Sequence, residues 1–320
     1  MNQSRRTTLI FFAATAFSGV VKAAVSVPSS IRIIIPWPPG SGGDIAGRLV
    51  AQKLSEELHT NVYVENRAGA SGSIGSALGS REKPDGAALI LGNSASHGSS
   101  KFTIPNLAYD PVSSFTPISM LYRNTLVLAV NKDFPADSLP ALIDYAKKKP
   151  GSLAFGTPGV GTPHQLVGEL IKEKASIDMV HVPYKGSGQI MTDLVGGHIN
   201  LAVSAQAAAL EMYRAGKVKI IATADKERSR QLPEVPAISE TFPDFDVAGW
   251  GGLFGPEGLA PDLAARYERA VKKIMASPDF MQSMETNGFV PVSSTGDELQ
   301  AVVQEETKRW QAIVDRGTKL

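Results

Sequence analysis

The residues best suited to bind a ligand in this chain are glycines and hydroxyl side chains that follow apolar runs. In "IRIIIPWPPGSGGDIAGRLV", residues 31–50, an apolar run leads into a glycine cluster and then into an apolar spacing typical of a helix. A glycine turn before a helix exposes backbone N–H groups, and the helix dipole adds partial positive charge there. The stretch therefore predicts an anion site that needs no lysine.

Two nucleotide-binding motifs do not fit this loop. A dinucleotide fingerprint that includes Gly40 and Gly42 would need Gly or Ala where the chain has Ile45. A P-loop would need Gly-Lys-Ser or Gly-Lys-Thr after the glycines, and neither follows. The loop taken alone is also compatible with a purely structural tight turn, so the other loops decide its interpretation.

Four further loops share this character. Segments 154–166 and 181–195 again combine a strand, a glycine turn and a helix, and in the first of them Thr162 stands at the N-cap position before Pro163. Segments 65–75 and 91–100 are rich in small residues and begin where strands end. Ligands of open α/β sheets bind beyond the carboxyl ends of the strands. Together the five loops predict one ligand cleft with a polar wall that accepts anions.

Single residues in these loops allow more than one role. Asp44 could brace the first loop or accept an ammonium group, and bracing is favoured because the residue stands near a helix start. His97 and His164 could contact ligand hydroxyls or a second carboxylate, or serve structure. Lys185 could supply a cation to the ligand or point to solvent. Trp37 could form a pocket wall or pack between domains.

The elements that must position these loops alternate along the chain. Hydrophobic periodicity predicts strands at 31–37, 61–67, 87–94, 124–132, 152–157, 179–184, 199–205 and 218–224, and helices at 44–58, 74–78, 138–151, 163–174, 189–195, 208–215, 262–276 and 297–316. This alternation predicts an α/β fold with mixed, mostly parallel sheets and helices on both faces.

The length of the chain favours two domains. A single hydrophobic core becomes uncommon beyond roughly 250–300 residues. We expect one domain to contain residues 28–124 and 250–320, and the other residues 125–249. The chain would cross between them at 124–132 and return at 242–256. Two crossings predict a hinge, and a hinge predicts a cleft between the domains.

The first residues predict a secretory signal peptide, residues 1–23. Arg5 and Arg6 precede an uncharged run of about 15 residues, and small or apolar residues precede a cut after Ala23. The run is short for a membrane span, which needs about 20 residues, although an uncleaved anchor is an alternative. The pair of arginines leaves export by either the general or the twin-arginine route open. We expect a periplasmic protein.

Composition and motifs disfavour several classes of protein. The chain has no cysteine, so neither a disulfide framework nor thiol chemistry is available. Removal of residues 1–23 would leave 29 Lys and Arg residues against 31 Asp and Glu, which gives no reason to expect a nucleic-acid partner. No Gly-x-Ser-x-Gly or His-Glu-x-x-His motif occurs. We expect no enzyme, no metal and no cofactor; a secreted hydrolase is the least favoured alternative.

The loop sequences together resemble the Bug family, the extracytoplasmic solute receptors of tripartite tricarboxylate transporters. The resemblance covers essentially the whole chain after the signal peptide and depends on the order and spacing of eight stretches: "PWPPGSGGDIAGRL", "VENRAGASGSIGS", "PDGAALILGNS", "YDPVSSFTPIS", "GTPGVGTPHQL", "HVPYKGSGQIMTDLVGGHINL", "LPEVPAISE" and "GWGGLFGPEG". It implies a two-domain periplasmic binding protein of the Venus-flytrap type, in which each domain offers a loop and a helix N-terminus to a carboxylate.

The same resemblance implies a set of ligand-binding residues. Carried over by motif, they are Trp37, Ser41, Gly42, Gly43, Asp44, Ser71, Ser73, Asn93, Ser94, His97, Thr157, Gly159, Val160, Gly161, Thr162, His164, Tyr184, Lys185, Gly186 and Ser204. The chain also departs from the family pattern. The family commonly has Phe at position 37, Thr at 43, Ser then His at 164 and 165, Asp then Asn at 204 and 205, and Phe at 251.

The implied partners are a small carboxylate ligand and the membrane subunits of a tripartite tricarboxylate transporter. A ligand sensor that signals to a sensor kinase is an alternative, because both roles need the same closing cleft. We expect a monomer. Dicarboxylates, tricarboxylates, acidic amino acids and aromatic acids all fit the predicted loops.

Overall fold

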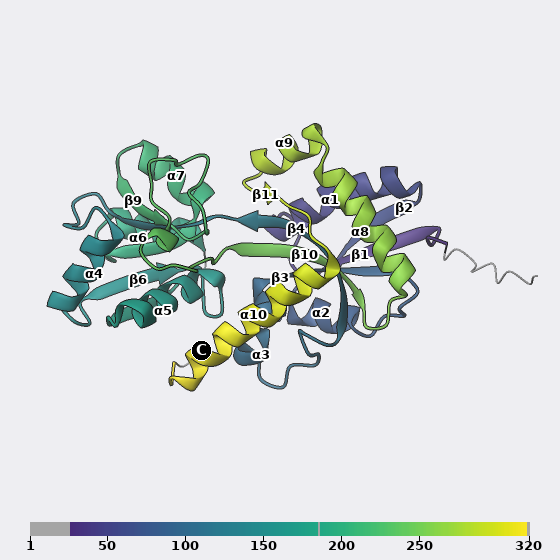
Figure 1. The fold of residues 1–320 in the computed structure, drawn as a ribbon, viewed down its shortest axis with the longest axis horizontal. Coiled ribbons are helices and arrows are strands. Elements are labelled where there is room, and N and C mark those ends of the chain that lie inside the picture. Colours follow the sequence, from purple (N-terminus) through teal and green to yellow (C-terminus); the bar gives the residue numbers. More distant parts are fainter. Residues whose placement is uncertain (1–25, 185, 319–320) are drawn as a thin grey trace, which may run out of the picture.

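The computed structural model describes residues 26–184 and 186–318, which form two β-sheets, each with helices on both faces (Figure 1). The expected signal peptide and Lys185 lie outside the described residues. We call the first sheet with its helices the first lobe and the second sheet with its helices the second lobe. Within the described ranges no helix is both long and apolar enough to cross a membrane.

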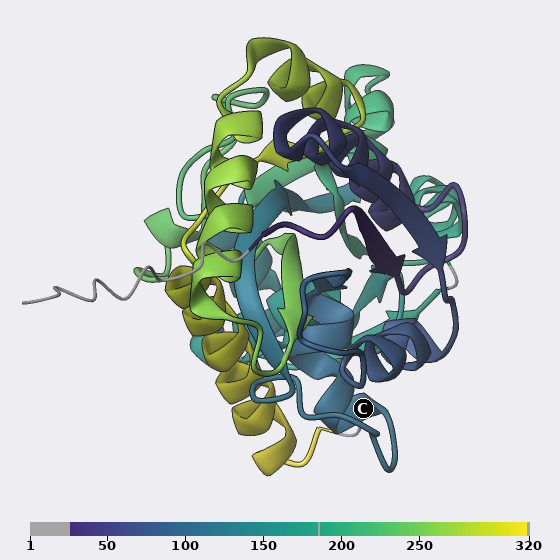
Figure 2. The ribbon, with the colours of Figure 1, turned by 90° about the vertical axis from the view of Figure 1, so that its right-hand side faces the viewer.

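The first lobe is built on a sheet of six strands. Their order is β11 (Val290–Pro291), β4 (Phe115–Asn124), β10 (Gly249–Pro256), β3 (Ala88–Asn93), β1 (Ser30–Ile35) and β2 (Asn61–Asn66). One face packs against α1 (Gly42–Leu58), α8 (Pro261–Met275) and α9 (Pro278–Thr286). The opposite side carries α2 (Ser73–Gly79), the π-helix η2 (Ser94–Ser99), α3 (Ser100–Thr103) and α10 (Gly296–Asp315) (Figure 2). A short 3-10 helix, η1 (Ala70–Gly72), precedes α2.

Both faces of this sheet are buried. Successive side chains of a strand point to opposite faces. Leu89 and Leu91 accordingly pack on the α1 and α8 side, whereas Ile90 packs on the α10 side. Leu253 and Phe254 of β10 divide in the same way. A sheet covered on both faces explains why these strands are near-continuous apolar runs rather than alternating ones.

The second lobe is built on a sheet of five strands. Their order is β7 (Met179–Pro183), β6 (Leu153–Thr157), β8 (Leu201–Ala205), β5 (Leu126–Asn131) and β9 (Val218–Thr223). Helices α4 (Leu139–Lys148) and α5 (Pro163–Ala175) cover one face, and α6 (Ser187–Val195) and α7 (Gln206–Arg214) cover the other. The loop after β9 contains the 3-10 helix η3 (Ile238–Glu240).

The α/β architecture is confirmed, but antiparallel pairing is more extensive than expected. Parallel pairs join β1 to β2 and β3, and β6 to β7 and β8. Strand β10 pairs antiparallel with both β3 and β4, and β5 pairs antiparallel with β8 and β9. The reason is the connectivity: strands that carry the chain between the lobes enter each sheet against the direction of the βαβ strands.

Among the longer elements, β4, β10 and α9 did not follow from the sequence pattern, and neither did the short β11 and α3. Strand β10 has the sequence "GWGGLFGP", and glycine weakens strand interiors because it has no side chain to pack. Here glycine is required at position 251, since a Cβ atom would lie 2.3 Å from Cζ of Tyr122. Residues 249–256, which we expected to be part of a glycine-rich connection between the domains, therefore form a fully buried strand inside the sheet.

Three segments connect the lobes. Strand β4 leads through Thr125 into β5, and β10 returns the chain to the first sheet. The third is α10, whose Leu299 packs in the core of the first lobe while Trp310 packs in the core of the second. Figure 1 shows α10 running obliquely along the molecule from one lobe toward the other.

Candidate functional site

The start of α1 leaves two backbone N–H groups without an acceptor. The Oγ atom of Ser41 caps the helix by accepting from the N–H of Asp44 at 3.4 Å. Within the described part of the chain, the N–H groups of Gly42 and Gly43 donate to no protein atom. Gly42 is exposed. These two donors at the positive end of the helix dipole are the first element of an anion site.

Asp44 holds the first loop in place. It is 3% exposed, and its Oδ2 accepts from the N–H of Gly40 at 2.9 Å and from Nε of Arg48 at 3.0 Å. Its Oδ1 accepts from Nδ2 of Asn66 at 2.8 Å. Burial acts to raise the pKa of this carboxyl, but the hydrogen bonds from Arg48, Gly40 and Asn66 keep the pKa below its usual value. With both oxygens engaged, the carboxylate supports the bracing role rather than binding of an ammonium group.

Trp37 packs on the backbone of Gly43. A Cβ atom at position 43 would lie 2.6 Å from Cε3 of the indole, so no larger residue fits without moving the ring. The other edge of the indole reaches the next loop, because a Cβ atom at Gly72 would lie 3.3 Å from Nε1. Nε1 donates to no atom of the described residues. Trp37 thus joins two candidate ligand loops and leaves an N–H donor between them.

The loop after β3 is strongly ordered by its own side chains. Oδ1 of Asn93 accepts from the N–H groups of Ala95 and Ser96, at 2.9 and 3.0 Å, and caps η2. Oγ of Ser94 accepts from the N–H of Trp250 at 3.3 Å. Among the small residues of the neighbouring loop, Ser71 is exposed and Ser73 is buried. Asn93 retains a free amide N–H₂ group in the described structure, whereas Ser94 mainly holds β10 in register.

The expectation that His97 faces the ligand is not supported. The ring is 0% exposed, stacks on Phe254 with centroids 4.3 Å apart, and lies 4.5 Å from the Phe115 centroid. Its Nδ1 is 2.9 Å from Oγ of Ser96. Burial lowers the pKa of His97 to about 3, so the ring is neutral. It is a component of the aromatic core behind η2.

In the second lobe the loop before α5 is held in two left-handed glycine turns. Gly159 has φ of 145° and Gly161 has φ of 73°, values that favour glycine. Oγ1 of Thr162 donates to the carbonyl of Gly159 at 2.8 Å and accepts from the N–H of Gln165 at 3.4 Å. The N–H of Gly161 donates to Oε1 of Gln165 at 2.8 Å. Gln165, which the sequence reasoning did not select, therefore uses one of the donors expected to contact the ligand.

His164 has no hydrogen-bond partner for either ring nitrogen in the described structure, and both nitrogens are buried. Burial lowers its pKa to about 4, so the ring is neutral near pH 7 and offers one donor and one acceptor. Because Pro163 has no N–H, the backbone N–H of His164 is the free donor at the start of α5. Buried polar groups without partners are rare and need an explanation. A bound ligand would provide one.

Two buried hydroxyls lie in one row across the second sheet. Val127 of β5 pairs with Ser204 of β8 on one side and with Thr223 of β9 on the other. Directly paired residues point to the same face of a sheet. Both hydroxyls are buried and lack partners in the described residues. Ser204 was expected at the site; Thr223 was not, although a polar residue ending the apolar run "VKIIAT" was a possible signal.

The remaining expected residues are mostly engaged within the second lobe. Oγ1 of Thr157 lies 2.7 Å from Nε2 of His181, and the hydroxyl of Tyr184 donates to Oδ2 of Asp193 at 2.7 Å. Val160 is 44% exposed. Gly186 precedes α6, and a Cβ atom there would meet nothing within 4 Å. Thr157 and Tyr184 thus shape the loops rather than offer free polar groups.

The candidate loops of the two lobes are in contact. A Cβ atom at Gly161 would lie 2.6 Å from Cγ2 of Thr103 and 3.0 Å from Oγ of Ser99, both in the first lobe. A Cβ atom at Gly72 would lie 3.3 Å from Cβ of Ser96. Together with the contact of Trp37 at Gly72, these distances make the loops after β1, β2, β3 and β6 neighbours, as their positions at the carboxyl ends of the strands predict.

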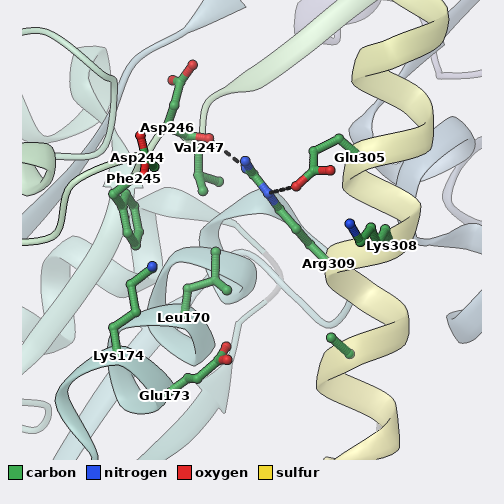
Figure 3. Close-up of a pocket in the computed structure, with 11 residues that line it drawn as sticks. Leu170, Glu173, Lys174, Asp244, Phe245, Asp246, Val247, Glu305, Lys308 and Arg309 are labelled. Atoms are coloured by element: carbon green, nitrogen blue, oxygen red, sulfur yellow. Dashed lines mark hydrogen bonds and ion pairs between the residues drawn. The ribbon is translucent and has the colours of Figure 1, made fainter.

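A cavity of about 340 Å³ lies away from these loops (Figure 3). It is bounded by α5, α10 and the segment before β10, and none of the expected ligand-binding residues lines it. Sequence reasoning missed it because its walls come from three distant segments without a local motif.

Comparison with known proteins gives consistent results. Residues 46–318 match the family described as tripartite tricarboxylate transporter family receptor. The chain is 31% identical to the protein BugT of Bordetella pertussis over 325 aligned positions, which cover 100% of both chains.

Solved structures with the same fold include two with bound acids. An R. palustris protein solved with adipate is 27% identical, with a TM-score of 0.74, and the match covers 89% of this chain and 96% of that one. MatC from Rhodopseudomonas palustris, solved with bound malate, is 28% identical, with a TM-score of 0.69 and coverage of 89% and 98%.

Proposed function

The chain belongs to the tripartite tricarboxylate transporter family of receptors, and from this premise we propose that it captures a small organic carboxylate between its two lobes in the periplasm. Proteins of this family and fold are solute-binding receptors and not enzymes. Delivery to the membrane subunits of a tripartite tricarboxylate transporter is part of the proposal. So is export of a mature chain that begins near Ala24.

The observation that carries the proposal is the pair of free N–H groups of Gly42 and Gly43 at the start of α1. The second lobe adds the unpaired ring and backbone N–H of His164 at the start of α5. A hydrogen bond to a charged group contributes roughly 1.5–3 kcal/mol, and a helix terminus up to about 2 kcal/mol. Four such bonds and two helix termini, less the entropic cost of association, are of the order of the roughly 8 kcal/mol that micromolar binding requires.

The division into domains that we propose follows the sheets. Residues 28–124 and 250–320 would form one domain and residues 125–249 the other, supported by the strands each sheet contains. The C-terminal part of α10 would then pack on the second domain, through Trp310 and Ile313. Binding at the loops where the lobes meet would favour the closed arrangement in proportion to the ligand's preference for it. We assign the ligand to the class of small organic acids with at least one carboxylate, supported by the adipate and malate found in the two relatives.

A thermal-shift screen tests the proposal. The mature chain would be heated with a panel of mono-, di- and tricarboxylates and acidic amino acids, with phosphate, sugars and nucleotides as controls. A ligand at 100 times its Kd adds about 2.7 kcal/mol to the free energy of unfolding. We expect a rise in Tm with a carboxylate; a rise only with a nucleotide or a sugar would contradict the proposal.

Replacing Gly42 by valine tests the loop itself. A Cβ atom at Gly42 would meet nothing closer than Cζ of Phe289 at 3.6 Å, so the variant should fold. Its side chain would cover the free N–H groups, and we expect affinity for the acid found in the screen to fall at least about tenfold, the loss of roughly one charged hydrogen bond. Pro140→Val, at the exposed start of α4 and outside the five candidate loops, is the control. Unchanged affinity in Gly42→Val would refute the role of this loop.

A further inference from the structure

The cavity in Figure 3 joins elements of both lobes. Leu170 and Lys174 of α5 form one wall, Lys308 and Ala312 of α10 form the opposite wall, and Phe245 lies in the segment that leads to β10. Its volume of about 340 Å³ is within the range of small-molecule sites, roughly 300–1,000 Å³. It is separate from the carboxylate site proposed above, because none of that site's residues lines it.

Most of the acidic side chains around this cavity already have partners. Glu305 accepts from Nε of Arg309 at 3.2 Å, and Glu173 pairs with Arg316 at 2.7 Å. The carboxylate of Asp246 accepts from Nη2 of Arg123. These three carboxylates are therefore partly neutralised within the protein.

The lysines are not neutralised in this way. Within the described residues, Lys174 and Lys308 make neither an ion pair nor a hydrogen bond, and Asp244 is the one lining carboxylate that is also unpaired. The two lysines lie on opposite walls, and the guanidinium of Arg309 is directed toward Glu305 and the backbone carbonyl of Asp246 (Figure 3). Among the lining side chains that make no ion pair within the described residues, two are cationic and one is acidic.

The remaining lining is apolar. Phe245 and Val247 are buried beneath the cavity, and Leu170 and Ala312 add aliphatic surface. Apolar walls with a few convergent charges are typical of sites for small amphiphilic molecules. We infer that this cavity is a second ligand site, which takes a small organic anion with an apolar body, attracted by Lys174 and Lys308.

The test uses benzoate as the probe, because it combines one carboxylate with an apolar ring. Backbone amide NMR signals of the mature protein would be followed during titration, with Leu170, Phe245 and Ala312 reporting on this cavity and Gly42 reporting on the carboxylate site between the lobes. Sulfate serves as an anion without an apolar body. Two charge-reversal variants are compared: Lys174→Glu/Lys308→Glu at the cavity, and Lys147→Glu/Lys148→Glu on exposed α4 as the control with the same change of net charge.

We expect benzoate to shift the cavity signals along a saturable curve and sulfate to bind more weakly. The Lys174→Glu/Lys308→Glu variant should raise the Kd for benzoate at these signals at least about tenfold, because two attractive charges near the ligand become repulsive. In the control variant, Lys147→Glu/Lys148→Glu, the Kd for benzoate should stay within about twofold of the wild-type value, since exposed charges at a distance are screened.

Three results would overturn the inference: no saturable shift at the cavity signals, equal weakening by both variants, or equal affinity for sulfate. A fourth result would also overturn it: cavity signals that shift with the same Kd as the Gly42 signal and shift equally in Lys174→Glu/Lys308→Glu. Such signals would report closure of the lobes rather than binding in the cavity. Because Gly42 is read separately, failure of the proposed carboxylate site would remain distinguishable.

Discussion

At the scale of single residues, Gly43 and Gly251 are glycines for the same physical reason. Gly43 lies under the indole of Trp37, and Gly251 lies under the ring of Tyr122. In each case a Cβ atom would come within 2.6 Å of a ring carbon. The large aromatic residue and the glycine therefore form a matched pair at both positions.

This matching predicts the effect of Gly43→Thr. The new side chain would collide with Trp37, and overpacking of this kind costs about 1–3 kcal/mol. We expect lower stability in urea unfolding and altered tryptophan fluorescence. The double variant Trp37→Phe/Gly43→Thr should recover most of the loss, because the smaller ring leaves room; additive losses would contradict the proposed pairing.

At the scale of elements, α10 holds η2 against β10. Glu306 of α10 is 7% exposed, accepts from Nε1 of Trp250 in β10, and places its unpaired Oε1 against Gly98 of η2, where a Cβ atom would lie 2.5 Å away. Burial raises the pKa of Glu306 to about 7, although the Trp250 N–H and Arg309 oppose the rise.

The raised pKa predicts a dependence of stability on pH. The folded protein holds the proton of Glu306 more tightly than the unfolded chain, whose pKa is near 4.5. The extra stability is therefore complete below about pH 4.5 and is lost as the pH rises to about 7. Between pH 5 and pH 8 this group should lower the free energy of unfolding by about 2–3 kcal/mol.

Urea unfolding at pH 5 and pH 8 checks this expectation. Glu306→Gln keeps an acceptor for Trp250 but does not titrate. From pH 5 to pH 8 its free energy of unfolding should therefore fall by about 2–3 kcal/mol less than that of the wild type. Glu305→Gln, on the exposed side of the same helix, should behave as the wild type. If Glu306→Gln and the wild type show the same difference, the buried carboxyl is not the titrating group.

At the scale of the whole molecule, a charge cluster ties together the segments that cross between the lobes. Arg123, near the end of β4, donates through Nη2 to Asp225 at 3.2 Å and to Asp246 at 2.5 Å. Asp225 follows β9, and Asp246 precedes β10. Arg309 of α10 donates to the backbone carbonyl of Asp246 at 2.7 Å. All three connections between the lobes thus meet at one point.

Removing Arg123 should weaken this junction. Arg123→Gln would leave two partly buried carboxylates near each other without a cation, at a cost of about 1–3 kcal/mol, less than for a fully buried pair. We expect a lower urea midpoint and faster hydrogen exchange in β5 and β10. Arg228→Gln, which breaks an exposed pair with Glu240, is the control and should cost less. An equal loss in both variants would show that the cluster has no special role.

Local sequence patterns were sufficient to predict the α/β class, the positions of most strands and helices, and the loops that follow the strands. Apolar runs, caps such as Ser138 and Thr162, and glycines at helix starts act through contacts within a few residues, so their signals are local. Asp44 could be assigned a bracing role for the same reason.

The tertiary structure decided what depends on distant segments. His97 and His164 both stand in polar loops, yet His97 stacks on Phe254 and His164 does not pair, because only the fold determines which ring the core covers. Strand β10 is buried despite its glycines because Tyr122 fills the space of the missing side chain. The cavity between α5 and α10 and the buried carboxyl of Glu306 likewise arise where long-range packing brings separate segments together.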